Sequence, residues 1–124
     1  MLQKSDVFST YSIKNKEQTK SFYSDTLGLA VQENHMGLIE FDINGHSVKM
    51  YQKQDHQPAA FTVLNFLVDD LDSEADDLIA KGVKMEKYDG FDQDEKGISR
   101  GRGPNIAWFK DPSGNIISII EKNS

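Results

Sequence analysis

Histidine is the first residue type to consider for chemistry in this chain, because cysteine is absent. An imidazole ring can bind a divalent metal or move a proton near neutral pH. The three histidines, His35, His46 and His56, fall in turns or at the edges of predicted strands, and their spacing is not that of a ligand cluster. We interpret them as solvated side chains. The absence of cysteine also excludes disulfides, thiolate nucleophiles and thiolate metal sites.

Hydroxyl, amine and carboxyl groups do not indicate catalysis either. The sequence shows no nucleophile with an adjacent base, and no pair of carboxylates at strand positions that would face a binding site. The Gly-x-Gly pieces within residues 89–104 do not predict a phosphate-binding loop, because no helix N-terminus follows them. We therefore name no catalytic residue, and the sequence leaves open whether the protein is an enzyme.

The composition limits the size of the fold and the kinds of partner. The chain has 124 residues, of which 37% are hydrophobic, and this is enough for one domain with a modest core. A net charge of −6 argues against nucleic acid as a partner, because binding to phosphates needs clustered Lys and Arg. The start lacks the apolar core of a signal peptide, and no run reaches membrane-spanning length. We expect a cytoplasmic protein that binds no membrane.

The first 52 residues predict the order strand, helix, strand, strand, strand. Asn15 stands at the N-cap of a helix over residues 16–26, and Gly28 can take the left-handed conformation that ends it. Asn44-Gly45 is a strong signal for a two-residue hairpin turn. The predicted strands are residues 7–13, 29–33, 38–43 and 46–52.

The second half repeats this order after a polar linker at residues 53–60. Asp70 is the second N-cap, the helix covers residues 71–81, and Gly82 ends it. The predicted strands are residues 61–68, 83–88, 106–109 and 116–120, and Asp111–Asn115 forms the turn of the last hairpin. We interpret the chain as one domain, residues 1–124, made of two β-α-β-β-β modules: module one is 1–52 and module two is 61–124.

Residues 89–104 interrupt the repeat. The segment is rich in glycine and charge and has no hydrophobic periodicity. Two interpretations stay open: a disordered surface loop, or a lid over a binding site, since long loops in compact domains are often functional.

The ordered motifs resemble those of the vicinal oxygen chelate superfamily, which contains glyoxalases, bleomycin-resistance proteins, fosfomycin-resistance enzymes and extradiol dioxygenases. The resemblance covers nearly the whole chain and rests on residues 22–29 (FYSDTLGL), 68–71 (VDDL), 80–83 (AKGV) and 111–115 (DPSGN). It implies an α+β fold in which the sheets of two β-α-β-β-β modules curl around a cleft and the helices pack outside.

The resemblance also implies where a metal ion would bind. In metal-dependent relatives, one ligand lies on the first strand and one on the last strand of each module. The corresponding residues here are Phe8, Lys49, Val63 and Ser118, and their immediate neighbours offer no usual ligand either. We therefore expect no metal ion and no other cofactor.

Strand alternation predicts a mostly apolar ligand-binding face with a few polar groups, as is common in small-molecule sites. The residues predicted to line it are Phe8, Thr10, Ser12, Lys49, Tyr51, Val63, Asn65, Trp108 and Ser118, although the face on which Trp108 lies is left open. The opposite face should pack on the helices and carries Val7, Ile13, Val48, Met50, Leu64, Phe66, Ile117 and Ile119. Alternatively, the first set fills the interior of the sheets or forms a dimer surface.

These observations favour a metal-free binding protein similar to bleomycin-resistance proteins. We expect a homodimer that holds a small aromatic or cationic molecule, for example to sequester a drug or a metabolite. Lys49 in the predicted site, with no acid beside it, counts against bleomycin itself. Two alternatives remain: a metal-dependent lyase, isomerase or dioxygenase with ligands outside the expected register, and an interaction subunit whose cleft is filled.

Overall fold

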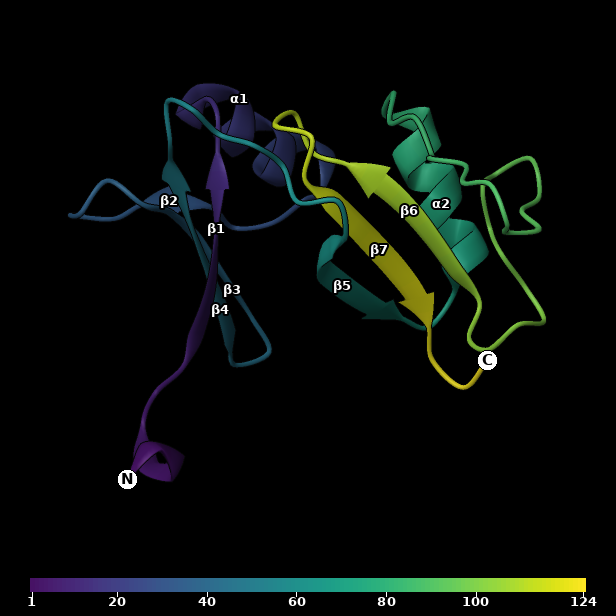
Figure 1. The fold of residues 1–124 in the computed structure, drawn as a ribbon, viewed down its shortest axis with the longest axis horizontal. Coiled ribbons are helices and arrows are strands. Elements are labelled where there is room, and N and C mark those ends of the chain that lie inside the picture. Colours follow the sequence, from purple (N-terminus) through teal and green to yellow (C-terminus); the bar gives the residue numbers. More distant parts are fainter. The chain divides into compact units, whose positions relative to one another are not determined.

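A computed structural model describes all residues from Met1 to Ser124, and the chain divides into two compact units, Met1–Gln57 and Pro58–Ser124 (Figure 1). Each unit combines a small sheet with a helix, so the fold is α+β, as predicted. None of the helices has the length and apolar content needed to cross a membrane.

The first unit contains a four-stranded sheet in the order β1-β4-β3-β2. Strand β1 runs parallel to β4, and the remaining pairs are antiparallel. After a short 3-10 helix at Leu2–Lys4, the elements are β1 (Phe8–Ile13), α1 (Lys16–Ser21), a π-helical turn (Phe22–Thr26), β2 (Gln32–Glu33), β3 (Ile39–Ile43) and β4 (His46–Gln52).

Local sequence signals explain the boundaries of these elements. The Asn15 side chain accepts a hydrogen bond from the backbone N–H of Gln18 at 2.9 Å, which is the predicted N-cap. Gly28 has φ +74° where the helix ends, and Asn44 and Gly45 have φ of 47° and 82°, as a tight hairpin turn requires. The strand predicted over residues 29–33 is wrong for its first half, because only Gln32 and Glu33 pair with β3.

One face of the first sheet forms the core of its unit. Tyr23 stacks on Phe41 with ring centroids 5.6 Å apart, and its hydroxyl lies 2.7 Å from that of Tyr11. The other buried core residues of this unit are Ile13, Ile39, Val48 and Met50. The predicted packing of Ile13, Val48 and Met50 is confirmed, whereas Val7 precedes β1 and is exposed.

The second unit contains a three-stranded sheet in the order β5-β7-β6, with β5 parallel to β7 and β6 antiparallel to it. Its elements are β5 (Thr62–Val68), α2 (Leu71–Ala80), β6 (Ile106–Lys110) and β7 (Ile116–Glu121). Asp70 caps α2 by accepting a hydrogen bond from the backbone N–H of Ser73 at 3.1 Å.

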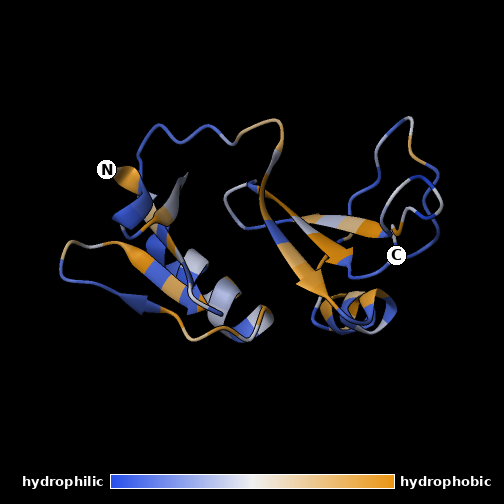
Figure 2. Cartoon of the chain, turned by 90° about the horizontal axis from the view of Figure 1, so that it is seen from below, coloured by the Kyte–Doolittle hydropathy of each residue, from blue (hydrophilic) through white to orange (hydrophobic).

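Apolar side chains join α2 to this sheet. The helix buries Leu71, Ala75 and Leu78. The sheet buries Ala107, Phe109, Ile117 and Ile119. Figure 2 shows that hydrophobic residues dominate the strands of this unit, while α2 alternates hydrophobic and hydrophilic residues. The helix therefore covers one face of the sheet. Ile117 and Ile119 lie on that face, as expected.

The strand predicted over residues 83–88 is wrong. The backbone N–H of Glu86 does donate to the carbonyl of Trp108 at 2.8 Å, but no ladder follows. Instead, the Gln93 side chain donates to the Glu86 carbonyl at 2.9 Å and accepts from the Tyr88 N–H at 2.8 Å. A side chain thus satisfies backbone groups that a neighbouring strand would otherwise satisfy.

The Asp111–Asn115 turn closes the last hairpin as predicted. The buried Asp111 carboxylate accepts hydrogen bonds from the backbone N–H groups of Ser113 and Asn115, both at 2.9 Å, and from the Asn115 side chain at 3.0 Å. Gly114 has φ +83°. These contacts hold β6 and β7 in one register.

Candidate functional site

The predicted binding residues of the first unit lie on one face of its sheet, the face opposite the core. Register places Thr10 beside Lys49 and Lys49 beside Glu40, so these three residues form a row across β1, β4 and β3. We call this surface the first outer face. Its members are Phe8, Thr10, Ser12, Glu40, Lys49 and Tyr51.

An ion pair occupies the middle of the first outer face. The Lys49 ammonium lies 2.5 Å from the Glu40 carboxylate, which is only 9% exposed and also accepts a hydrogen bond from the Gln32 side chain at 3.3 Å. The hydrogen bond from Lys49 lowers the pKa of Glu40 and outweighs the opposing effect of burial. Glu40 is therefore a carboxylate at neutral pH, and the pair carries no net charge.

Aromatic rings flank this ion pair. The Lys49 ammonium lies 5.2 Å from the centroid of the Phe8 ring, within the range of a cation–π contact. Phe8 is 52% exposed and Tyr51 is 40% exposed, so both rings present apolar surface to solvent. The first outer face thus combines a neutralised ion pair with two accessible rings.

Glu40 corrects the expectation that the predicted site holds Lys49 and no acid. The sequence contained the signal that places Glu40 there, namely the Asn44-Gly45 turn. A two-residue turn at Asn44-Gly45 pairs Ile43 with His46, and the same register sets Glu40 opposite Lys49.

The remaining polar residues of the first outer face hold their neighbours in place. The Thr10 hydroxyl donates to the Lys49 carbonyl at 2.6 Å, and the Ser12 hydroxyl lies 2.6 Å from His56 Nδ1. On the opposite face, His46 Nε2 lies 3.2 Å from the Ser9 hydroxyl. The interpretation of the histidines as solvated is confirmed for His35 and His46, which are exposed, whereas His56 is partly buried.

The second unit brings three of its four predicted residues together. Asn65, Ser118 and Trp108 form a row across β5, β7 and β6, on the face opposite α2, which we call the second outer face. The buried Ser118 hydroxyl donates to the Asn65 side-chain oxygen. Val63 does not share this arrangement, because it lies in the register shift between Thr62 and Leu64 and has no partner on β7.

Trp108 is covered, although it lies on an outer face. It is 9% exposed because two rings pack on it edge-on: Tyr88, with centroids 5.5 Å apart, and Phe91, with centroids 5.0 Å apart. Phe91 belongs to the 89–104 segment that the sequence left open between a disordered loop and a lid. No periodic signal in the sequence predicts that this segment reaches Trp108.

The four positions where the resemblance implies metal ligands do not fit a metal ion. The Lys49 ammonium is positively charged and paired with Glu40, and the Ser118 hydroxyl is already bonded to Asn65. Phe8 and Val63 offer no donor atom. No group of three or more His, Asp or Glu side chains lies together in the chain in a way that could hold a metal.

Comparison with known proteins agrees with this fold. The profile of the Glyoxalase/Bleomycin resistance protein/Dioxygenase superfamily matches residues 10–119. The chain is 28% identical to Uncharacterized protein YraH of Bacillus subtilis, and the match covers 88% of this chain and 91% of that protein.

Two solved structures illustrate the range of proteins that share the fold. TnmS3, an antibiotic binding protein from Streptomyces sp. CB03234, superposes with a TM-score of 0.69 at 21% identity, covering 95% of this chain and 97% of that one. Lactoylglutathione lyase from Agrobacterium tumefaciens superposes with a TM-score of 0.70 at 17% identity, covering 96% and 94%. At these identities the likeness concerns the fold alone.

Proposed function

Because the chain belongs to the glyoxalase/bleomycin resistance protein/dioxygenase superfamily, we propose that it is a small-molecule-binding protein that works without a metal ion. Its ligand would bind on the outer faces of the sheets, where Phe8, Tyr51, Asn65 and Trp108 lie. The role is sequestration of a drug or a metabolite, for which TnmS3, an antibiotic binding protein of the same fold, is a precedent.

The pairing of Lys49 with Glu40 is the observation that carries this proposal. It puts a cation at a position where the resemblance implies a metal ligand, and it neutralises that cation within the same face. Small-molecule sites are lined mostly by apolar and aromatic side chains with a few placed polar groups. Because the pair is neutral while the Phe8 and Tyr51 rings are accessible, an aromatic ligand fits this face better than a strongly cationic one.

A ligand panel tests the proposal. Each compound is added to purified protein, and the melting temperature is recorded. A compound present at about one hundred times its dissociation constant should stabilise the fold by roughly 2.7 kcal/mol. The matched control is the Glu40→Gln/Lys49→Met double variant, which removes both charges and keeps the apolar stem. Compounds that contact the ion pair itself should lose most of their effect in this variant, and a panel without any hit would contradict the proposal.

Homodimerisation is a further part of the proposal. It follows the resemblance and is supported by large apolar side chains at the surface of the second unit, such as Phe61 and Leu67. Light scattering during size-exclusion chromatography should give twice the mass of the 124-residue chain. A single-chain mass at micromolar concentration would contradict this part alone.

A metal-dependent lyase, isomerase or dioxygenase is the second candidate. Glu40 favours it, because a nearly buried carboxylate lies on the first outer face one strand away from an expected ligand position. Metal analysis of protein purified without chelator separates the two candidates. Stoichiometric Ni, Zn, Mn or Fe would rule out the metal-free proposal, and no retained metal after incubation with excess ion would rule out the enzyme.

A further inference from the structure

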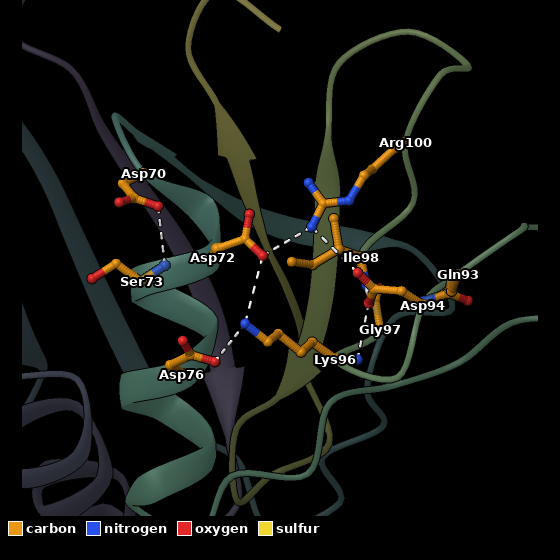
Figure 3. Close-up of polar contacts among 10 residues, drawn as sticks. All are labelled: Asp70, Asp72, Ser73, Asp76, Gln93, Asp94, Lys96, Gly97, Ile98 and Arg100. Carbon is orange, nitrogen blue, oxygen red and sulfur yellow. Dashed lines mark hydrogen bonds and ion pairs between the residues drawn. The ribbon is translucent and has the colours of Figure 1, made fainter.

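The segment between α2 and β6, residues 89–104, is fastened to α2 by charges. Lys96 Nζ lies 2.8 Å from an Asp76 oxygen and 3.6 Å from an Asp72 oxygen. Arg100 lies 2.9 Å from the same Asp72 and 3.3 Å from Asp94 (Figure 3). We call these five residues the clasp.

The turn that presents the two cations is itself well ordered by hydrogen bonds. The Asp94 carboxylate accepts from the backbone N–H groups of Lys96 and Ile98, both at 2.9 Å. Gly97 has φ +81°, and a Cβ there would lie 3.2 Å from the Met85 side chain, so the turn favours glycine. Ile98 is buried beneath the turn. The segment is thus a structured strap and not a disordered loop.

The strap covers Trp108. Its Phe91 ring packs on the indole, and half of the surface of Phe91, 49%, remains in solvent. Tyr88, the residue just before the strap, packs on the indole from another direction, and its hydroxyl is buried without a hydrogen-bond partner. A buried, unpaired hydroxyl destabilises the closed arrangement relative to an open one, in which water can reach it.

The clasp is the part of the strap's attachment that responds to salt. The hydrogen bond to Asp76 raises the pKa of Lys96, which indicates a favourable interaction between the two charges. All clasp side chains nevertheless remain partly exposed, and ion pairs at the surface are weakened by salt. The strap is also joined to β6, because Ser99 and Ile106 exchange backbone hydrogen bonds at 2.9 and 3.1 Å and both Ile98 and Ser99 are buried. The clasp is therefore the salt-sensitive part of the attachment.

We propose that the strap is a gate over the second outer face, held closed by the clasp together with the pairing of Ser99 with Ile106, and that its opening uncovers Trp108 next to Ser118 and Asn65. This inference rests on the proposed function, since it takes that face as part of the ligand-binding surface. A flat aromatic molecule would replace the Phe91 ring on Trp108, because it offers the indole the same kind of contact. Ligand access therefore depends on ionic strength and on the clasp charges.

The fluorescence of Trp108 tests the gate in the absence of any ligand, because this is the only tryptophan in the chain. Acrylamide, a neutral quencher, reports how often the indole is exposed. The Lys96→Ala/Arg100→Ala variant opens the clasp. The matched control, Lys84→Ala/Arg102→Ala, removes two exposed cations that form no ion pair and changes the net charge by the same amount.

The expected result is a quenching constant about threefold higher in the clasp variant than in the wild-type protein at about 0.1 M NaCl, with the control unchanged. Wild-type protein should approach the clasp variant at about 1 M NaCl, where the Debye length falls to about 3 Å, and the clasp variant should no longer respond to salt. Equal constants in the clasp variant and the control would overturn the gate.

A charge exchange protects the test against a variant that fails to fold. Lys96→Asp alone should raise the quenching constant, and Lys96→Asp combined with Asp76→Lys should lower it part of the way back, because the shorter pair is rebuilt with its signs reversed while the carboxylate of Asp72 stays in place. A wild-type constant in Lys96→Asp, or a folded exchange variant that stays high, would overturn the gate. If no compound of the ligand panel binds, the proposed function is contradicted, but the quenching measurement is unaffected. The two failures are therefore distinguishable.

Discussion

The Lys49 ammonium lies 2.5 Å from the Glu40 carboxylate, directly across the β3–β4 pair on the first outer face. Because this contact lowers the pKa of Glu40 from its ordinary value of 4.5, the folded state binds a proton less readily than the unfolded chain. The stabilisation is therefore present above pH 4.5 and is lost as the pH falls through the lowered pKa.

The Glu40→Gln variant tests this dependence on pH. It should lower the urea midpoint near neutral pH and have a smaller effect as the pH falls through the lowered pKa of Glu40, because the wild-type side chain then loses its charge as well. Adding Lys49→Met to Glu40→Gln should recover part of the loss, because the unpaired ammonium is then removed as well. A difference between wild type and Glu40→Gln that stays constant with pH would contradict the ion pair.

The Asp111 carboxylate should be important for the stability of the last hairpin. Asp111→Ala leaves three donors in the hairpin turn without their acceptor, and we expect it to lower the free energy of unfolding by about 2–3 kcal/mol. Asp111→Asn is the matched control, because its oxygen can still accept from both backbone N–H groups. Urea denaturation should give it less than half of the effect, and equal losses would show that the turn needs the charge rather than the acceptor.

Shortening a side chain to Ala should affect stability differently on the two faces of the sheet that contains β5 and β7. Ile117 is fully buried against α2, so Ile117→Ala should cost about 2–5 kcal/mol through lost burial and a cavity. Leu67 lies on the second outer face and is 60% exposed, so Leu67→Ala should change stability by no more than about 0.5 kcal/mol. Thermal or urea unfolding of both variants checks the assignment of the faces, and comparable losses would refute it.

Phe8 should matter for binding and not for folding. With a compound found in the ligand panel, Phe8→Ala should weaken affinity about tenfold, equivalent to about 1.4 kcal/mol, while the melting temperature without ligand stays close to that of the wild type. Met36→Ala is the control, because Met36 is a similarly exposed apolar residue that lies in a turn. Titration calorimetry measures both variants. Equal affinity of Phe8→Ala and wild type would place the ligand elsewhere.

Residues with a local physical role could be predicted from the sequence. The helix caps Asn15 and Asp70 and the turn at Asn44-Gly45 act through contacts only two or three residues away, and all three form as predicted. Alternation then assigned Lys49 and Ser118 to the outer faces, because a strand exposes every second residue on the same side.

Features that depend on distant contacts could not be predicted in this way. The alternating residues 83–88 have the pattern of a strand, but the Gln93 side chain takes the hydrogen bonds that a ladder would use. The cover over Trp108 depends on how the strap folds back, where Lys96 and Arg100 pair with α2 and Ser99 pairs with Ile106 of β6. Tertiary contacts of this kind leave no periodic trace in a sequence.

The alternation of the strands also bears on how such a protein can diversify. Side chains that hold each unit together, such as Met50 and Ile117, alternate along the same strands with those that face outward, such as Lys49 and Ser118. A substitution at an exposed outward position disturbs few core contacts and so costs little folding free energy. Random drift and selection can therefore replace exposed residues of the outer faces, such as Tyr51 and Leu67, one at a time, while the scaffold is inherited unchanged.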